Sequence, residues 1–184
     1  MKVKGSAVAA LQQFIKESHG SVGYASWLNA LPVTSRTVFA GGVLQSDWFP
    51  LRDSYIVPTQ TMCDLFHGGD QRASWEVGAF SARNSLRGIY RAFVRVASAA
   101  FVVDRAGSIF STYYTPGRIS TAEHSASRFV LHMTDIDEPH RILEYRICGW
   151  IEGALELCNA KQNRISISKS AVAGAPHTEI IIEV

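Results

Sequence analysis

The sequence lacks the patterns that usually indicate a metal centre, a disulfide framework or a membrane span. Its three cysteines, Cys63, Cys148 and Cys158, are an odd number, and their spacings match no zinc or disulfide motif. No apolar stretch approaches the roughly 20 residues of a transmembrane helix. The N-terminal segment is amphipathic, because polar residues such as Gln12 and Lys16 interrupt it, and it does not resemble a signal peptide. We therefore expect a cytoplasmic protein with no membrane span.

Charged residues are also scarce. They make up 18% of the 184 residues, whereas hydrophobic residues make up 47%. An interface between subunits removes surface that would otherwise carry charge, so this deficit favours an oligomer, and we expect a homodimer. The net charge of +2 is too small to indicate a nucleic-acid-binding protein, and no named nucleic-acid motif is present.

Acidic residues are absent between Glu76 and Asp104. Four arginines spaced by four residues lie in this interval and form a ridge along the predicted helix: Arg83, Arg87, Arg91 and Arg95. Guanidinium groups bind phosphates and carboxylates in a bidentate manner, so the ridge is a candidate site for an anion or a partner protein. The alternative is a solvated face neutralised by acids from elsewhere, such as Glu144, Glu152 or Glu156.

The first half of the chain has the spacing of helices. Residues 6–18 predict a first helix that ends at Gly20, because glycine is the usual residue just past a helix end. Short helical segments follow, and Pro58 should divide the one between Leu51 and Phe66. Residues 71–98 predict a further helix, with a break near residues 84–85.

The hydrophobic period then changes. Residues 108–114, 118–124 and 128–134 predict three antiparallel strands joined by short turns, and two more strands are predicted at 164–169 and 178–184. The last strand is apolar almost throughout, which favours a central position in the sheet. The fold class is therefore α+β: one domain, with a helical part over residues 1–98, then an antiparallel sheet of four to five strands crossed by one helix over residues 99–184.

The crossing helix is predicted over residues 138–160, with Pro139 at its first position. One apolar stripe recurs at spacings of three and four: Leu143, Ile147, Trp150, Ile151, Ala154 and Cys158. Gly149 and Gly153 each cost about 1 kcal/mol of helix stability relative to alanine. Another helix or a sheet should therefore approach the backbone closely at these positions.

Two clusters of side chains could carry chemistry. Cys63 and His67 stand one helical turn apart, but no third ligand or catalytic partner is near, so Cys63 is interpreted as a core residue. A set of aromatic residues could line an apolar ligand pocket between helices and sheet: Trp48, Phe49, Tyr90, Phe93, Tyr114 and Trp150. The alternative is that these rings simply fill the core.

Several short motifs support a resemblance to known families. The run 149–157, the Gly174-Ala-Pro176 turn and the closing strand 179–184 resemble the C-terminal end of the haem nitric-oxide/oxygen binding (H-NOX) domain and of the four-vinyl-reductase-type small-molecule-binding domain. The Trp48-Phe49-Pro50 element and the turn 113–117 are similar in particular to a haem-free bacterial group of myxobacterial type. This resemblance implies a ligand-enclosing fold.

The departures from those families concern cofactors. The haem-binding family is expected to carry a histidine on the long helix before the sheet, and residues 71–104 contain none. It should also hold the haem propionates with a Tyr-x-Ser-x-Arg strand, whereas strand 131–136 carries an acid there, and residues 114–118 match only in part. The zinc-binding cysteines of the vinyl-reductase type are missing, and His177 alone cannot hold zinc. We expect neither haem nor metal.

These observations predict a non-enzymatic, haem-free sensory or small-molecule-binding domain that signals through protein–protein interaction. One alternative is a structural or interaction protein whose core is filled by its own side chains. The other, an enzyme related to tetrapyrrole vinyl reductases, follows only from the resemblance. A small apolar molecule and a signalling protein are the expected partners.

Overall fold

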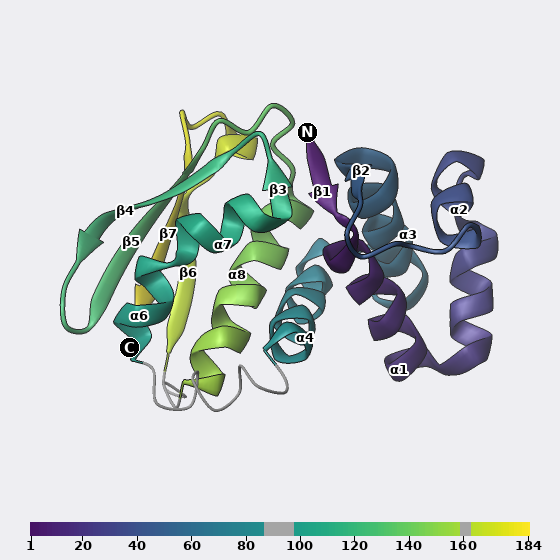
Figure 1. The fold of residues 1–184 in the computed structure, drawn as a ribbon, viewed down its shortest axis with the longest axis horizontal. Helices are drawn as coiled ribbons and strands as arrows, with labels where there is room; N and C mark the ends of the chain where they lie inside the picture. The colour runs from purple at the N-terminus through teal and green to yellow at the C-terminus, as the bar shows by residue number, and fades with distance from the viewer. Residues whose placement is uncertain (87–97, 159–162) are drawn as a thin grey trace.

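The computed structural model describes residues 1–86, 98–158 and 163–184. Figure 1 shows a group of helices on one side of the molecule and an antiparallel sheet on the other, with two long helices between them. The α+β class predicted from the sequence is confirmed, including the helical first half and a four-stranded antiparallel sheet.

Residues 1–86 contain four α-helices, and the breaks predicted at Gly20 and near Pro58 are confirmed. Helix α1 (Gly5–Ala30) is interrupted at Gly20, whose backbone has φ 67° and ψ −171°. A π-helical turn (Arg52–Ile56) gives way to α3 (Val57–Phe66) at Pro58. The remaining helices of this part are α2 (Val33–Ala40), a 3₁₀ turn (Gln71–Ala73) and α4 (Ser74–Ser85).

A small sheet ties the N-terminus to the middle of the chain, and the sequence analysis did not foresee it. Strand β1 (Lys2–Lys4) lies between β2 (Trp48–Pro50) and β3 (Tyr114–Thr115), and both pairings are antiparallel. Strands of two or three residues are too short to show an alternating pattern, so no sequence signal could have indicated them.

The predicted strand over residues 108–114 is wrong. Helix α7 (Ala106–Tyr113) occupies this region instead, preceded by the short helix α6 (Ala99–Asp104), and only Tyr114 lies in a strand. The residues are β-branched and aromatic, which favoured a strand, but Ile109, Phe110 and Tyr113 share one helical face that packs toward the interior. Tertiary packing therefore outweighs local preference here.

The main sheet has the order β4-β5-β7-β6, and every neighbouring pair is antiparallel. Its strands are β4 (Arg118–His124), β5 (Arg128–Thr134), β6 (Arg164–Lys169) and β7 (Thr178–Glu183), close to the predicted bounds. The last strand is central, as expected. Alternate residues of β5 and β7 point into the core and are at most 3% exposed: Phe129, Leu131, Met133, Ile180 and Ile182.

Helix α8 (Arg141–Leu157) crosses the sheet and also packs against α4. It begins later than predicted, because His140 is the N-cap: its Nδ1 accepts a hydrogen bond from the Ile142 amide at 3.2 Å. Pro139 therefore precedes the cap and is not the first helical residue. The predicted close approach at the glycines is confirmed, and the neighbour is a helix.

The contact between α4 and α8 depends on three glycines. A Cβ atom on Gly149 would overlap the Trp75 carbonyl, and one on Gly78 would overlap the Arg146 carbonyl. A Cβ on Gly153 would lie 2.7 Å from the carbonyl oxygen of Ala79. The two helix backbones are therefore as close as the absence of side chains permits.

Glu144, one of the acids suggested above as a partner of the arginine ridge, is instead buried on α8 and paired with other groups. Its side chain is 1% exposed. Its carboxylate accepts hydrogen bonds from Ser170 (2.8 Å), Thr178 (2.6 Å) and Arg141 (2.8 Å). These bonds tie the start of α8 to the hairpin between β6 and β7, and so fix the helix relative to the sheet.

No helix within residues 1–86, 98–158 and 163–184 is long and apolar enough to cross a lipid bilayer.

We predict that Gly149→Ala destabilises the protein, although alanine is the better helix former. The added methyl group forces α4 and α8 apart, and such overpacking costs about 1–3 kcal/mol. Urea unfolding measures the loss. Gly153→Ala is the matched control, with a smaller expected loss because its contact is looser. A gain of about 1 kcal/mol at Gly149, as on an exposed helix, would contradict the close packing.

Candidate functional site

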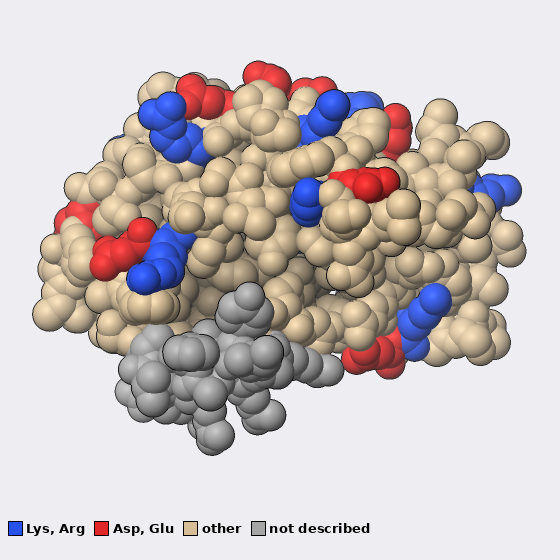
Figure 2. Space-filling model, in the orientation of Figure 1, with Lys and Arg blue, Asp and Glu red and all other residues tan. Residues whose placement is uncertain are grey.

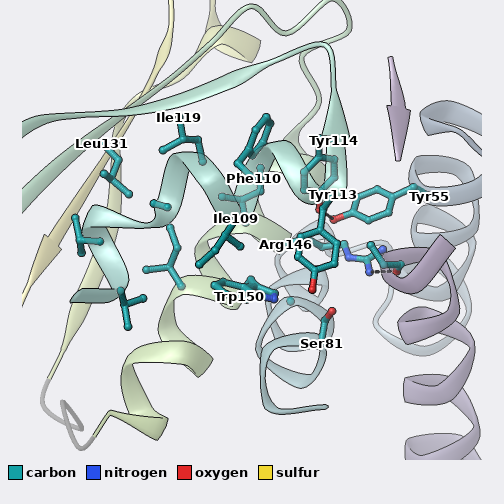
Figure 3. Close-up of a pocket in the computed structure, with 17 residues that line it drawn as sticks. Tyr55, Ser81, Ile109, Phe110, Tyr113, Tyr114, Ile119, Leu131, Arg146 and Trp150 are labelled. Atoms are coloured by element: carbon teal, nitrogen blue, oxygen red, sulfur yellow. Dashed lines mark hydrogen bonds between the residues drawn. The ribbon is translucent and has the colours of Figure 1, made fainter. Parts of the chain in front are cut away.

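A pocket opens between the two halves of the molecule, beneath α7 and beside α8. Figure 3 shows its lining side chains, which come from α1, the π-helical turn, α4, α6, α7, β3, β4, β5 and α8. Most are aliphatic or aromatic. The apolar end contains Ile119 and Leu131, whereas Tyr55, Tyr114 and Arg146 lie at the opposite end (Figure 3). The pocket is therefore amphipathic.

Arg146 is the unusual member of the lining. It lies on the buried side of α8 and is 2% exposed. Its two terminal nitrogens donate to the Thr59 hydroxyl (3.1 Å) and to the Ala7 carbonyl (3.0 Å), and the guanidinium lies over the Tyr55 ring at 3.7 Å from its centroid. The Nε atom is buried and has no hydrogen-bond partner.

The charge of Arg146 has no counterion in the described structure. No carboxylate of the described residues lies within 4.0 Å of its guanidinium nitrogens. Arg141, on the same helix, does have such a partner in Glu144. Residues 87–97 and 159–162 contain no Asp or Glu, so they could not supply one. A buried unpaired cation costs several kcal/mol, and native structures rarely retain one without a partner.

Two tyrosines next to Arg146 form a hydrogen-bonded pair. Their hydroxyl oxygens are 2.7 Å apart, and the rings meet edge to face. Burial raises the pKa of Tyr55 and raises that of Tyr114 well above its usual value, although the charge of Arg146 opposes both shifts. Both phenols are therefore neutral. Because one hydroxyl donates to the other, the accepting hydroxyl keeps a hydrogen for another acceptor.

A third free donor is Trp150. Its indole Nε1 is buried and has no hydrogen-bond partner. Together with Arg146 Nε and the second tyrosine hydrogen, the pocket lining offers several unsatisfied donors and a positive charge. A pocket with this balance favours a ligand that carries an acceptor, above all an anion.

The open space of the pocket is small. The cavity volume is about 50 Å³, which is room for roughly four waters. A ligand larger than a single aromatic ring would have to displace side chains.

The structure brings together some of the predicted pocket residues and not others. Tyr114 and Trp150 line the pocket. Trp48 is 39% exposed on β2, with Lys4 over its ring, and Phe49 packs near Gly5 at the small sheet. Neither of the two lines this pocket. Tyr90 and Phe93 lie outside the described residues.

The predicted arginine ridge is described only at its first member. Arg83 forms an exposed ion pair with Glu156 at 3.3 Å, as the solvated-face alternative expected. Arg87, Arg91 and Arg95 lie outside the described residues. On the face in Figure 2, positive and negative side chains stand near one another over a largely uncharged surface.

The cysteine near His67 has the character of a core residue. Cys63 is fully buried, and burial raises the pKa of its thiol to about 11. The thiol is therefore protonated at neutral pH and a poor nucleophile. The other two cysteines are also buried and free.

Sequence reasoning missed Arg146 and Tyr55, the two residues that define the polar end. The signal for Arg146 was available: it stands three residues after Leu143 and four before Trp150, so it falls within the apolar stripe of α8. An arginine in that position is either paired or functional. Tyr55 gave no such signal, because it lies in a π-helical turn, whose spacing differs from the 3.6-residue period of an α-helix.

No family model matches this sequence, and no curated protein matches it either. The comparison of structures, in contrast, finds similar folds among H-NOX proteins. An H-NOX protein from Shewanella oneidensis in the Fe(II)NO ligation state matches over 98% of both chains, with a TM-score of 0.72 and 15% sequence identity. A mutant of that protein in the Fe(II) state gives a TM-score of 0.75 at 16% identity, over 98% of this chain and 95% of the other.

A mutant H-NOX protein from K. algicida, Fe(II) and unliganded, gives a TM-score of 0.74 at 10% identity, again over 98% of this chain and 95% of the other. The fold is therefore H-NOX-like over nearly the whole chain. At these identities the likeness concerns the fold alone.

The residues present do not fit the haem that this fold suggests. The described lining contains no His, Cys or Met, and the sequence from 71 to 104 contains no His. The only oxygen donors with a known haem role are tyrosines, and burial keeps Tyr55 and Tyr114 protonated. The inward positions of β5 are Phe129, Leu131 and Met133, which offer nothing to a propionate.

We predict that the protein does not form a specific haem complex. Titration of purified protein with hemin should leave the absorption spectrum that of free hemin, because the described lining contains no histidine, cysteine or methionine and burial keeps the hydroxyls of Tyr55 and Tyr114 protonated. A shifted, saturable Soret band at one haem per chain would contradict this interpretation.

Proposed function

We propose that this chain is a haem-free, non-enzymatic sensory domain that binds a small amphipathic carboxylate in the pocket between its two halves. The observation that carries the proposal is the buried guanidinium of Arg146, which has an unpaired Nε and no carboxylate partner among the described residues. A ligand carboxylate would supply the missing counterion.

The chemistry of the lining supports this class of ligand. A carboxylate next to Arg146 would accept from its Nε and could also accept from the Trp150 indole and the free tyrosine hydrogen. Charge-assisted hydrogen bonds of this kind are roughly twice as strong as neutral ones. The apolar body of the ligand would then lie against Ile109 and Phe110 on α7. The small open volume favours a body of about one aromatic ring or a short alkyl chain.

A sensor also needs a route for its output. We propose that ligand occupancy changes how the domain associates with a second copy or with a signalling protein in the cytoplasm. The support is the low charge of the sequence and the position of the pocket beneath α7, a short helix that a ligand would contact directly. Sedimentation of the protein with and without ligand measures any change in assembly.

One observation favours a second candidate function, a protein–protein interaction domain with no ligand. The pocket is small enough that its own side chains nearly fill it. This alternative leaves the unpaired Arg146 unexplained, and the two candidates differ in whether an added acid binds.

We predict that benzoate raises the melting temperature of the protein in a concentration-dependent manner, with a Kd below about 1 mM. The ring fits the apolar lining and the carboxylate fits Arg146. Benzylamine has the same body and the opposite charge, so it should have no effect. Calorimetric titration checks the stoichiometry of one acid per chain. Equal shifts with both compounds, or none with either, would refute the carboxylate site.

We predict that Arg146→Met abolishes benzoate binding without destabilising the free protein. Methionine replaces the aliphatic stem of arginine and removes the desolvated charge, whose burial costs several kcal/mol, while the two lost hydrogen bonds are worth about 1.5–3 kcal/mol each. Urea unfolding should therefore give a free energy equal to or above that of the wild type. Arg83→Met, at an exposed arginine that does not line the pocket, is the matched control and should leave binding unchanged. A strongly destabilised Arg146→Met variant would instead show that Arg146 stabilises the fold and is not a ligand-binding residue.

A further inference from the structure

A second cluster of side chains lies on the outer face of the sheet, away from the pocket. Strand β7 carries Glu179, and His177 stands two residues before it, so both side chains point to the same face. In the antiparallel register His132 of β5 is directly opposite Glu179. His132 is 45 and 47 positions away from His177 and Glu179 in the sequence, and only the strand pairing brings it to them.

The distances within the cluster are close to those of a metal site. The Nε2 atom of His132 is 3.1 Å from Oε2 of Glu179, and Nε2 of His177 is 3.9 Å from the same oxygen. One ligand atom from each of the three residues lies within 4.8 Å of the others. Tetrahedral zinc with ligands at about 2.0–2.1 Å requires ligand atoms about 3.3 Å apart, so small rotations of the side chains would complete the set.

We propose that His132, His177 and Glu179 bind a divalent transition-metal ion, zinc above all. Two imidazoles and one carboxylate are a ligand set that zinc accepts, with water in the fourth position. His177 supports the proposal independently, because its Nε2 is buried and has no hydrogen-bond partner without a metal. The three side chains are 16% to 30% exposed, so an ion from solvent can reach them.

Two neighbours already hold the carboxylate of Glu179. Lys169 donates to Oε2 at 2.9 Å, and Ser168 donates to Oε1 at 2.7 Å. The Lys169 hydrogen bond, followed by that of Ser168, lowers the pKa of Glu179 to about 2, so the ligand is ionised before any metal arrives. Lys169 is 53% exposed and can turn into solvent when a cation takes its place. Lys169 therefore competes with the metal ion for the carboxylate of Glu179.

The test is titration of chelator-stripped protein with Zn²⁺ by calorimetry, and with Co²⁺ by visible absorption, near neutral pH. We expect one Zn²⁺ per chain, and cobalt bands typical of four- or five-coordination. His132→Ala, His177→Ala and Glu179→Gln should each weaken binding at least about tenfold, since even the loss of an outer-shell partner costs that much. His124→Ala on β4, an exposed histidine of the same sheet, should bind like the wild type.

Lys169→Met keeps the proposal testable if a substitution at one of the three metal-binding residues prevents folding. It should tighten zinc binding by up to about fivefold, because it removes an exposed ion pair that competes with the metal. Circular dichroism confirms that each variant is folded. The proposal is overturned if the wild type binds no zinc, or if zinc binds equally well to the His132→Ala and His177→Ala variants.

Discussion

The close packing of α4 against α8 is the constraint on which the rest of the structure depends. Gly78, Gly149 and Gly153 allow the two backbones to touch. Each of these glycines either lines the pocket or lies within two residues of a residue that does. Gly78 contacts the carbonyl of Arg146 and also lines the pocket. The glycines therefore set the depth at which Arg146 and Trp150 stand. On the opposite side, Glu144 holds the same helix to the hairpin between β6 and β7.

A helix fixed on both sides can keep a charged group in an unfavourable place. An arginine on a loosely held helix would turn toward water, because its long side chain can reach the surface. Here the backbone cannot shift, and the guanidinium is held by Thr59, the Ala7 carbonyl and the Tyr55 ring. The fold thus stabilises a donor-rich, positively charged corner that would otherwise be lost. This region is pre-organised for an anion, so binding needs little additional free energy to order the side chains.

Much of this architecture was predictable from sequence, and the exceptions have identifiable causes. The strands at 118–124 and 128–134, the interruption at Gly20 and the close approach at Gly149 followed from local patterns. The helix over residues 106–113 could not be predicted, because the β-branched and aromatic residues of this segment favour a strand and only tertiary packing stabilises the helix. The polar end of the pocket combines Tyr55, Tyr114 and Arg146 from three distant segments, and no spacing in a single sequence encodes that meeting. Of the four described members of the predicted aromatic set, two line the pocket, Tyr114 and Trp150, since aromatic character alone does not say which side of an element is enclosed.

Strand β5 shows how one element can serve two sites. Leu131 points inward and lines the pocket, whereas its neighbour His132 points outward toward Glu179. Because side chains alternate across a strand, a shift of one residue in register would move His132 into the core and Leu131 into water. The apolar inner faces of β5 and β7 exclude that shift, so the burial of Leu131 and Ile180 also fixes the outward alignment of His132 with Glu179. The geometry of the outer cluster is thus a consequence of core packing. An ion bound there would join the two central strands of the sheet on the face opposite to the pocket, where it would stabilise the register that both sites require.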